Sequence, residues 1–379
     1  RLEFIINNNI GVHPKACLEY PNVPGELRDA VERLSAGYAN PREFYISKIA
    51  EGVATIAAAF YPRKVIVRMS DFKSNEYRNL LGGNLFEHVE DNPMLGYRGV
   101  SRNIHDWEIE AFKLARGVYG GNNLRLMLPF VRTLEEARSM RSYLEQVHKL
   151  KSGQDGLKII LMSELPSNAI LAKQFISEFD GFSIGSNDMT QMVLATDRDN
   201  SSLSHIYDEE DPAVVWAILV TIFSGQKFGK KVGFCGQGVA NSEVLRGLVA
   251  ISGITSASVV PDTYYRTKQD FAAAEALNIS ASGLGKWLGE QHQAKLVKLL
   301  EAAGKADVAK LASDPAKIRA WYDAETARLH GELRDSLGGS RENTARKALK
   351  AFRATFHKPV IYAAWNWNET VEDALHQAG

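Results

Sequence analysis

Few cysteines and the lack of any charge bias exclude several classes of protein. The 379 residues include only Cys17 and Cys235, which are too few for a disulfide framework. The formal net charge is zero, which argues against a general affinity for nucleic acid or anionic membranes. No apolar run approaches the length of a membrane span, and no signal peptide is visible. We therefore expect a globular protein of the reducing cytoplasm.

Further absences narrow the fold and the kind of site. The first apolar run is not followed by a Gly-x-Gly-x-x-Gly turn, which weighs against an open dinucleotide-binding sheet. The nine histidines show no metal-ligand spacing such as His-x₃-His. The chain begins at Arg1 rather than at a methionine, directly before a run that resembles a strand. We expect it to be a fragment of a longer protein or a trimmed form of one.

Short apolar runs rich in β-branched residues alternate with amphipathic helical stretches through the first 277 residues. The expected strands are 2–6, 65–69, 124–131, 157–162, 179–184, 231–235 and 256–260. Helix periodicity covers 133–150 and 167–178, and Thr133 with Glu136 forms a capping box at a helix start. This alternation predicts an α/β protein with a parallel sheet, and the length fits a closed (β/α)₈ TIM barrel better than an open sheet.

The composition changes near residue 278. From there to residue 379 the sequence is rich in Ala, Lys, Glu, Arg and Leu, which predicts an α-helical C-terminal extension interrupted at Asp314-Pro315 and Gly338-Gly339. A more apolar segment, 359–367, is expected to dock the extension as a strand or a helix. The extension leans basic. We interpret this as a solvated helical face, with an acidic partner as the alternative.

Polar side chains stand where the expected strands end. They are Arg68, Glu164, Asn187, Asp188 and Cys235, and Arg98 lies in a glycine-containing loop. The ends of barrel strands converge at one mouth, which is where such folds keep their active sites. A carboxylate after a strand, such as Glu164, is rarely buried without a partner. Together these residues suit a small, doubly anionic substrate bound through a divalent metal.

Each residue also has a structural interpretation. Arg68 can pair with Asp71, and Arg98 can cap its own loop. Asp188 can be the N-cap of the helix that follows it, which is a common use of an Asn-Asp pair. Cys235 can be a small buried hydrophobe, although the glycines around it favour an exposed thiol. Taken one at a time, these residues do not decide between the structural and the functional interpretation.

Long motifs in the chain resemble the phosphoenolpyruvate-utilising enzymes, and within that family the pyruvate, water dikinases. The segments that carry the resemblance are 65–77, 92–99, 164–168, 182–191 extended to Arg198, and 233–237. The resemblance covers residues 1–277. It implies a phosphoenolpyruvate/pyruvate-binding (β/α)₈ barrel there, followed by the helical extension 278–379, whose role it does not explain.

The resemblance also implies roles for individual residues. Glu164 and Asp188 would hold Mg²⁺, and Cys235 would donate and accept the proton at the methyl carbon. The substrate-binding residues it implies are Arg1, Arg68, Arg98, Glu164, Gly185, Ser186, Asn187, Asp188 and Arg198. The expected ligands are pyruvate and phosphoenolpyruvate, and a homodimer is implied as well.

The complete enzymes of this kind also use an ATP-binding domain and a phosphorylated histidine, for which this sequence shows no motif. Gly338-Gly339-Ser340 has no histidine after it at a useful spacing. We therefore expect the pyruvate half-reaction, with phosphohistidine supplied by another chain or another part of the same protein. The alternatives are a stand-alone Mg²⁺-enolate barrel with lyase or aldolase chemistry, and a non-catalytic partner-binding protein.

Overall fold

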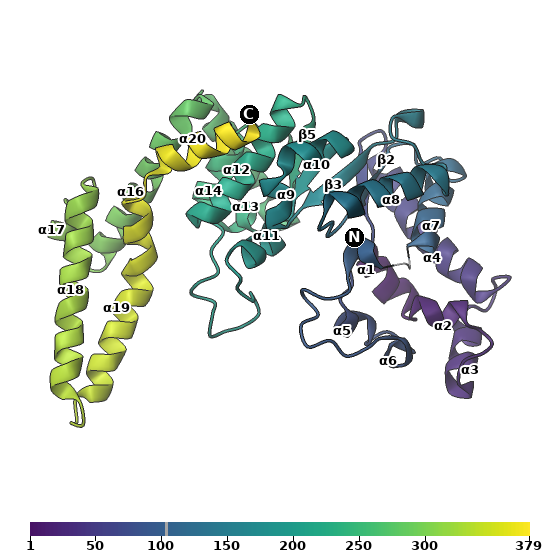
Figure 1. Cartoon of the computed structure of the whole chain (residues 1–379), viewed down its shortest axis with the longest axis horizontal. Helices are drawn as coiled ribbons and strands as arrows, with labels where there is room; N and C mark the ends of the chain where they lie inside the picture. Colours follow the sequence, from purple (N-terminus) through teal and green to yellow (C-terminus); the bar gives the residue numbers. More distant parts are fainter. Residues whose placement is uncertain (103–104) are drawn as a thin grey trace. The chain divides into compact units, whose positions relative to one another are not determined.

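The computed structural model describes residues 1–102 and 105–379, and the chain divides into two compact units (Figure 1). The first unit comprises Arg1–Ile184 with Phe228–Val232, and the second comprises Gly185–Lys227 with Gly233–Gly379. The helical extension therefore belongs to the same unit as the second half of the expected barrel. The boundary that we predict between residues 277 and 278 stays a prediction.

The first unit contains most of the sheet and the helices that alternate with its strands. Its helices are α1 (Leu2–Ile5), η1 (Ile6–Ile10), α2 (Pro14–Leu18), α3 (Gly25–Leu34), α4 (Pro41–Phe60), α5 (Ser74–Tyr77), α6 (Gly83–Phe86), η2 (Gly99–Ser101), α7 (Asp106–Gly117), α8 (Leu134–Gln146), η3 (Gln154–Gly156), α9 (Pro166–Ile170) and α10 (Ala172–Glu178). The expected helix 133–150 is confirmed as α8, where the Thr133 hydroxyl accepts a hydrogen bond from the backbone N–H of Glu136. The expected helix 167–178 is divided into α9 and α10 at Leu171.

The sheet is parallel, and its six strands follow sequence order. They are β1 (Val65–Arg68), β2 (Leu124–Leu128), β3 (Ile159–Ser163), β4 (Gly181–Ile184), β5 (Lys231–Phe234) and β6 (Ser256–Ala257). These strands confirm six of the seven expected runs. In the register of β3 and β4, Ser163 is paired with Ile184, so Glu164 and Gly185 follow the sheet at the same level. The described strands form a half-barrel. A closed eight-stranded barrel is not shown by them.

The expected first strand, 2–6, is wrong. Residues 2–10 form α1 and the π-helical turn η1, which ends at Gly11 with a left-handed φ of 71°. The buried side chains are Leu2, Ile6 and Ile10, and a spacing of four places them on one face of a helix. Phe4, which lies between them in the sequence, is exposed. A five-residue, mostly apolar run is too short to distinguish the helical period from the strand period.

The second unit joins the last strands to the helical extension. Its helices are α11 (Ser186–Val193), α12 (Pro212–Lys227), α13 (Gly238–Asn241), α14 (Glu243–Ile251), η4 (Pro261–Thr263), α15 (Tyr264–Ala276), η5 (Ala281–Gly283), α16 (Leu284–Ala302), α17 (Ala306–Ala309), α18 (Pro315–Ser336), α19 (Glu342–Ala363) and α20 (Trp367–Ala378). The predicted interruptions are confirmed, since Asp314 caps the start of α18 and the glycine pair separates α18 from α19. The apolar segment 359–367 contains the end of α19, a turn at residues 364–366 and the start of α20.

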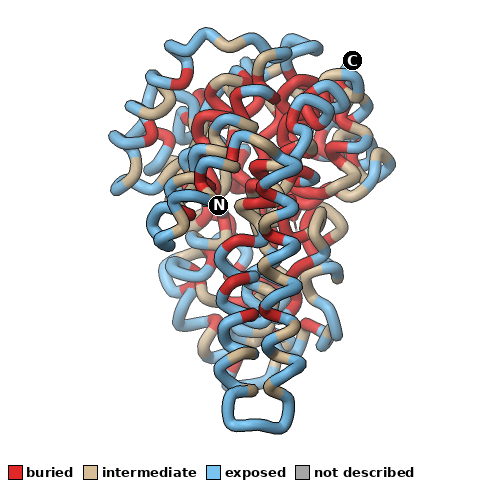
Figure 2. The backbone as a smooth tube through the Cα atoms, turned by 90° about the vertical axis from the view of Figure 1, so that its left-hand side faces the viewer, coloured by how far each residue is buried: buried red, intermediate tan, exposed pale blue. Residues whose placement is uncertain are grey.

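The extension has an apolar core of its own. Residues of α16, α18 and α19 bury one cluster that includes Leu300, Ile318, Phe352 and Val360. In Figure 2 the exposed turn that joins α18 to α19 lies at the foot of their hairpin. These buried side chains explain why an Ala- and Lys-rich sequence forms stable long helices, since packing contributes more than helix propensity.

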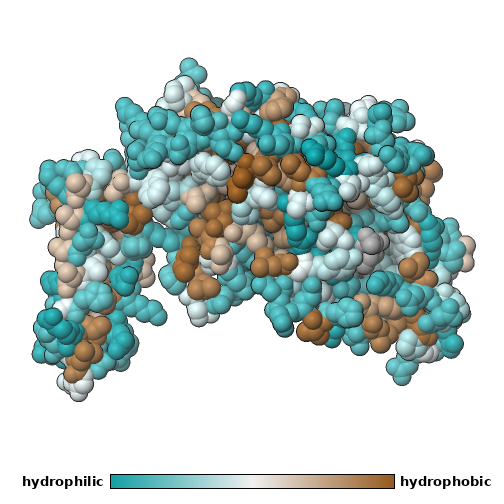
Figure 3. All heavy atoms as spheres, viewed as in Figure 1, coloured by the Kyte–Doolittle hydropathy of each residue, from teal (hydrophilic) through white to brown (hydrophobic). Residues whose placement is uncertain are grey.

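Helix α20 packs against α12, the most apolar helix of the unit. Trp367, Val371 and Ala374 of α20 are buried, and hydrophilic residues cover the face of α20 seen in Figure 3. Within the described parts of the chain, no helix has the length and apolarity needed to cross a membrane.

The stability of the extension is expected to fall in mild acid because of His292 in α16. Its ring is buried and stacks on Trp367 at 4.8 Å between centroids, and burial lowers its pKa to about 4. The unfolded chain would take up this proton near its ordinary pKa of about 6.5, whereas the folded chain would not, so stability declines as pH falls from about 6.5 to 4. The full contribution is up to about 3 kcal/mol.

The measurement is urea unfolding of the chain at pH 7 and pH 5. His292→Phe keeps a ring against Trp367 and takes up no proton, so its loss of stability between the two pH values should be smaller than that of wild type. His330→Gln, at an exposed position of α18, is the control and should behave as wild type does. Equal pH dependence of wild type and His292→Phe would contradict the assignment.

Candidate functional site

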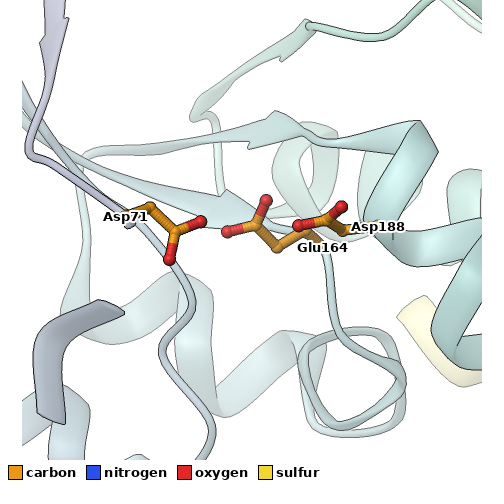
Figure 4. A group of neighbouring side chains, drawn as sticks. All are labelled: Asp71, Glu164 and Asp188. Atoms are coloured by element: carbon orange, nitrogen blue, oxygen red, sulfur yellow. The ribbon is translucent and has the colours of Figure 1, made fainter. Parts of the chain in front are cut away.

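The first unit brings two buried carboxylates together at the carboxyl ends of its strands. Asp71 follows β1 and Glu164 follows β3, and their ligand oxygens lie within 4.8 Å of each other (Figure 4). Asp71 is 5% exposed and Glu164 is 2% exposed. Buried like charges at this separation need compensating cations. Asp188, which is also drawn in Figure 4, belongs to the second unit.

Arg98 supplies the main compensation. Its Nε and Nη2 donate to the two oxygens of Asp71 at 3.0 and 2.6 Å, which is a bidentate pair. Arg68 is farther away, with Nη1 4.0 Å from Asp71 Oδ2. The guanidinium of Arg98 also lies 3.9 Å from the centre of the Phe130 ring. The structural pairing of Arg68 with Asp71 is therefore present but weak, and Arg98 does more than cap its own loop.

Arg68 has a second carboxylate partner that the sequence did not indicate. Glu3 of α1 forms an ion pair with Arg68 and accepts a hydrogen bond from the backbone N–H of Asp71 at 3.2 Å. Burial alone would lower the pKa of Arg68, but Glu3, Asp71 and Glu164 raise it above its ordinary value, so the guanidinium stays charged. Within residues 1–102 and 105–379, neither Arg68 Nε nor Glu3 Oε2 has a hydrogen-bond partner, although both atoms are buried.

Backbone contacts fix the position of Glu164. Its Oε1 accepts the backbone N–H of Phe130 at 2.7 Å. The Oδ1 of Asn168 accepts the N–H groups of Glu164 and Leu165 at 3.2 and 3.1 Å, and Asn168 Nδ2 donates to the carbonyl of Val131 at 2.9 Å. Phe130 has a φ of 50°, which a non-glycine residue rarely adopts. The strained backbone at Phe130 thus aims an N–H group at the carboxylate.

In the second unit, the turn after β4 leads directly into α11. Gly185 is the N-cap of this helix and provides no side-chain cap, and Ser186, Asn187 and Asp188 form its first turn. Asp188 is therefore not an N-cap, which corrects that structural interpretation. Its carboxylate lies in the first turn, where the helix dipole favours negative charge.

The turn after β5 packs closely on this first turn. The backbone N–H of Gln237 donates to Asn187 Oδ1 at 3.2 Å. A Cβ at Gly236 would lie 1.7 Å from Ser186 Oγ, so only glycine fits. Cys235, the residue before it, is a free and partly buried thiol. Cys17 differs, because its burial raises the pKa of the thiol to about 12, which agrees with a structural role.

Two more of the expected site residues, Arg1 and Arg198, are exposed arginines. Arg1 is exposed and occupies the N-cap position of α1, two residues before Glu3. Arg198 is exposed, with Nε 3.8 Å from Asp199 Oδ1, and its backbone N–H donates to Gln191 Oε1 at 3.5 Å. Arg68, Arg98 and Glu164 are gathered within the first unit, whereas Arg198 belongs to the second.

Sequence reasoning missed Glu209, which the structure places beside the α11 turn. Ser186 Oγ donates to Glu209 Oε1. Burial raises the pKa of Glu209, while the bonds from Ser186 and the Gly238 backbone lower it in part. The acidic run 208–211 was the available signal, but nothing in it showed which carboxylate faces the site.

Comparisons with known proteins agree with this arrangement. Residues 30–276 match the family model described as PEP-utilising enzyme, PEP-binding domain. A phosphoenolpyruvate synthase of Neisseria meningitidis is 50% identical over 274 residues, which are 70% of this chain and 34% of that protein. One from Escherichia coli is 48% identical over the same shares, and one from Aeropyrum pernix is 40% identical over 73% of this chain and 32% of that protein. The chain spans about a third of the length of these relatives.

Proposed function

The chain belongs to the PEP-utilising enzymes, and on that premise we propose that it carries the site at which pyruvate enolate receives a phosphoryl group. The proposed donor is a phosphohistidine and the product is phosphoenolpyruvate. The observation that supports this most directly is the buried Asp71–Glu164 pair beside Arg68 and Arg98. With Glu3, three carboxylates face these two guanidinium groups, and such an excess suits a divalent cation and a dianionic substrate together.

The donor set fits Mg²⁺, which prefers carboxylate oxygens. We propose Glu164 and Asp188 as its ligands, and within the first unit Asp71 is a further carboxylate beside Glu164. Glu164 needs no rearrangement for this role, since the N–H of Phe130 already orients its carboxylate. A bound Mg²⁺ would supply Lewis-acid stabilisation of the enolate oxygen.

The arginines are proposed to bind the anionic groups of the substrate. Arg68 is charged, and its buried Nε–H has no acceptor among the described residues. A carboxylate or phosphoryl oxygen of the substrate would accept this hydrogen bond. Arg98 is held rigid by Asp71 and the Phe130 ring, so little side-chain entropy remains to be lost on binding. Arg1 and Arg198 are proposed to approach the substrate from the edges.

Around the reacting carbon, Gly185, Ser186 and Asn187 are proposed to complete the pocket with backbone N–H groups at the start of α11. Cys235 is proposed to remove a proton from the methyl group of pyruvate. The enolate oxygen then attacks the phosphorus of a phosphohistidine whose other ring nitrogen carries a proton, the N–P bond breaks, and the imidazole leaves neutral, while the methyl proton stays on Cys235. In the reverse direction the cysteine returns the proton to the methylene carbon.

The phosphohistidine is proposed to reside on a part of the protein, or on a partner, outside these 379 residues. The relatives named phosphoenolpyruvate synthase are about three times as long as the matched region, so they have room for further domains. The scarcity of cysteines supports our proposal of a cytoplasmic location.

Calorimetric titration with oxalate, which mimics the pyruvate enolate, tests this proposal. With Mg²⁺ present we expect saturable binding of one oxalate per chain, and without Mg²⁺ we expect none. Succinate is the control ligand, because its carboxylates are too far apart to chelate one ion as oxalate does. Absence of oxalate binding, or binding that does not depend on Mg²⁺, would contradict the proposed function.

A further inference from the structure

The C-terminal extension contacts the neighbourhood of the site through a short stretch of chain. This bridging segment, residues 206–210, lies between α11 and α12 in the second unit. Its residues alternate in direction: Tyr207 and Glu209 contact the α11 turn, whereas Ile206, Asp208 and Glu210 contact the extension. The segment is not a strand: residues 206, 209 and 210 lie in turns, and the backbone N–H of Asp211 donates to the carbonyl of Asp208 at 3.2 Å.

The side facing the site joins two functional turns. The hydroxyl of Tyr207 donates to the carbonyl of Asn187 at 3.2 Å. Glu209 accepts hydrogen bonds from Ser186 Oγ and from the backbone N–H of Gly238. A Cβ at Gly238 would lie 2.7 Å from Glu209 Oε2, so this approach is close. One carboxylate therefore ties the turn after β4 to the turn that follows Cys235.

The opposite side is held by two lysines and a tyrosine of the extension. Lys358 of α19 donates to the carbonyl of Ile206 at 3.0 Å and lies 3.3 Å from Asp208 Oδ2. The hydroxyl of Tyr362 donates to the same oxygen of Asp208 at 3.1 Å. Lys295 of α16 donates to both oxygens of Glu210 at 2.9 and 2.8 Å.

These contacts rest on a rigid base. Tyr362 packs its ring against Trp367 and His292, and all three side chains are buried. Glu210 also accepts a bond from Ser242 at 2.8 Å, at the start of α14. Lys295 and Lys358 thus belong to well-packed helices. The bridging segment is therefore held on the side that faces the extension as well as on the side that faces the α11 turn.

We infer that the C-terminal extension is a positioning element for the substrate site. Helices α16 and α19 form hydrogen bonds and ion pairs with Ile206, Asp208 and Glu210. These contacts keep Tyr207 and Glu209 bonded to the 185–188 turn, which stabilises the binding conformation of that turn. This inference rests on the proposed function for the identity of the ligand. The family match ends at residue 276, so Lys295, Lys358 and Tyr362 lie outside the matched domain.

The test is the double substitution Lys295→Ala with Lys358→Ala in the full chain, because each exposed ion pair alone contributes little. We expect the Mg²⁺-dependent affinity for oxalate to fall at least about fivefold. Amide hydrogen exchange should accelerate in both 185–191 and 204–211. Lys295→Arg with Lys358→Arg keeps the charges and should restore both readouts.

Lys310→Ala with Lys317→Ala is the matched control. It removes two charges from the same extension, where these lysines pair with Asp307 and Asp314 of their own helix starts, and it should leave both readouts unchanged. Acceleration of 204–211 without any effect on 185–191 or on oxalate affinity would overturn the inference, since the contact would then be merely structural. If wild type binds no oxalate, the proposed function fails, and hydrogen exchange in 185–191 alone decides the inference.

Discussion

Glu164→Gln is expected to lower the Mg²⁺-dependent affinity for oxalate by at least about 100-fold. The substitution keeps the size of the side chain and an oxygen that can accept the N–H of Phe130, so the orientation of the group is preserved. It removes the negative charge that a hard divalent cation requires. Isothermal titration with oxalate in the presence of Mg²⁺ measures the effect.

The same variant should be at least as stable as wild type when no metal is present. In the cluster of Glu3, Arg68, Asp71, Arg98 and Glu164, three carboxylates face two guanidinium groups. Neutralising Glu164 balances these charges and removes its repulsion with Asp71, whose oxygens lie within 4.8 Å. A group kept for ligand binding rather than stability shows this combination of lost affinity and retained stability.

Glu178→Gln is the control, because Glu178 ends α10 and pairs with Arg138 on the surface. It should alter neither oxalate affinity nor the melting temperature appreciably. Retention of wild-type affinity by Glu164→Gln would exclude Glu164 as a metal ligand. A large drop in its melting temperature would instead assign the buried carboxylate to the stability of the unit.

Most of the sheet could be predicted because its strands are short apolar runs that end in a polar residue. Glu164 and Arg68 were identified in this way, since parallel strands bring their carboxyl ends to one edge. The sequence suggests Asp71 only as a partner for Arg68, whereas in the structure its bidentate partner is Arg98, 27 residues further along the chain. No local pattern encodes which of two arginines reaches a given carboxylate.

The contacts that sequence reasoning missed join segments far apart in the chain. The position of Glu3 could not be predicted, because its segment is expected to be a strand but forms a helix. The side of the segment on which Glu3 lies differs between the two structures. Lys358 and Asp208 are ordinary surface charges in the sequence, and only the packing of α19 brings them to 3.3 Å. The extension was correctly predicted as helical from composition, but the surface on which it packs is a tertiary property.

Cys235→Ala is expected to abolish the exchange of pyruvate methyl protons while leaving the site able to bind oxalate. The thiol follows β5 and precedes the Gly236-Gln237 turn, whose bond to Asn187 comes from the backbone N–H of Gln237 and does not involve the thiol. Its removal therefore should not disturb the residues proposed to hold Mg²⁺. Loss of a general acid–base group lowers such a rate by about 10²–10⁴-fold.

The two readouts separate proton transfer from binding. Nuclear magnetic resonance of pyruvate in deuterated water, with Mg²⁺ and the chain, follows the exchange, and titration with oxalate follows the site. Cys17→Ala is the matched control, since it removes the other thiol, which is buried and held protonated by its raised pKa, and it should exchange protons at the wild-type rate. Exchange at the wild-type rate in Cys235→Ala, with oxalate binding intact, would mean that another group carries the proton. Loss of both readouts together would give the thiol a part in binding. Only loss of exchange with intact binding makes Cys235 the acid–base group, because oxalate has no carbon-bound proton to transfer and its affinity is insensitive to that function.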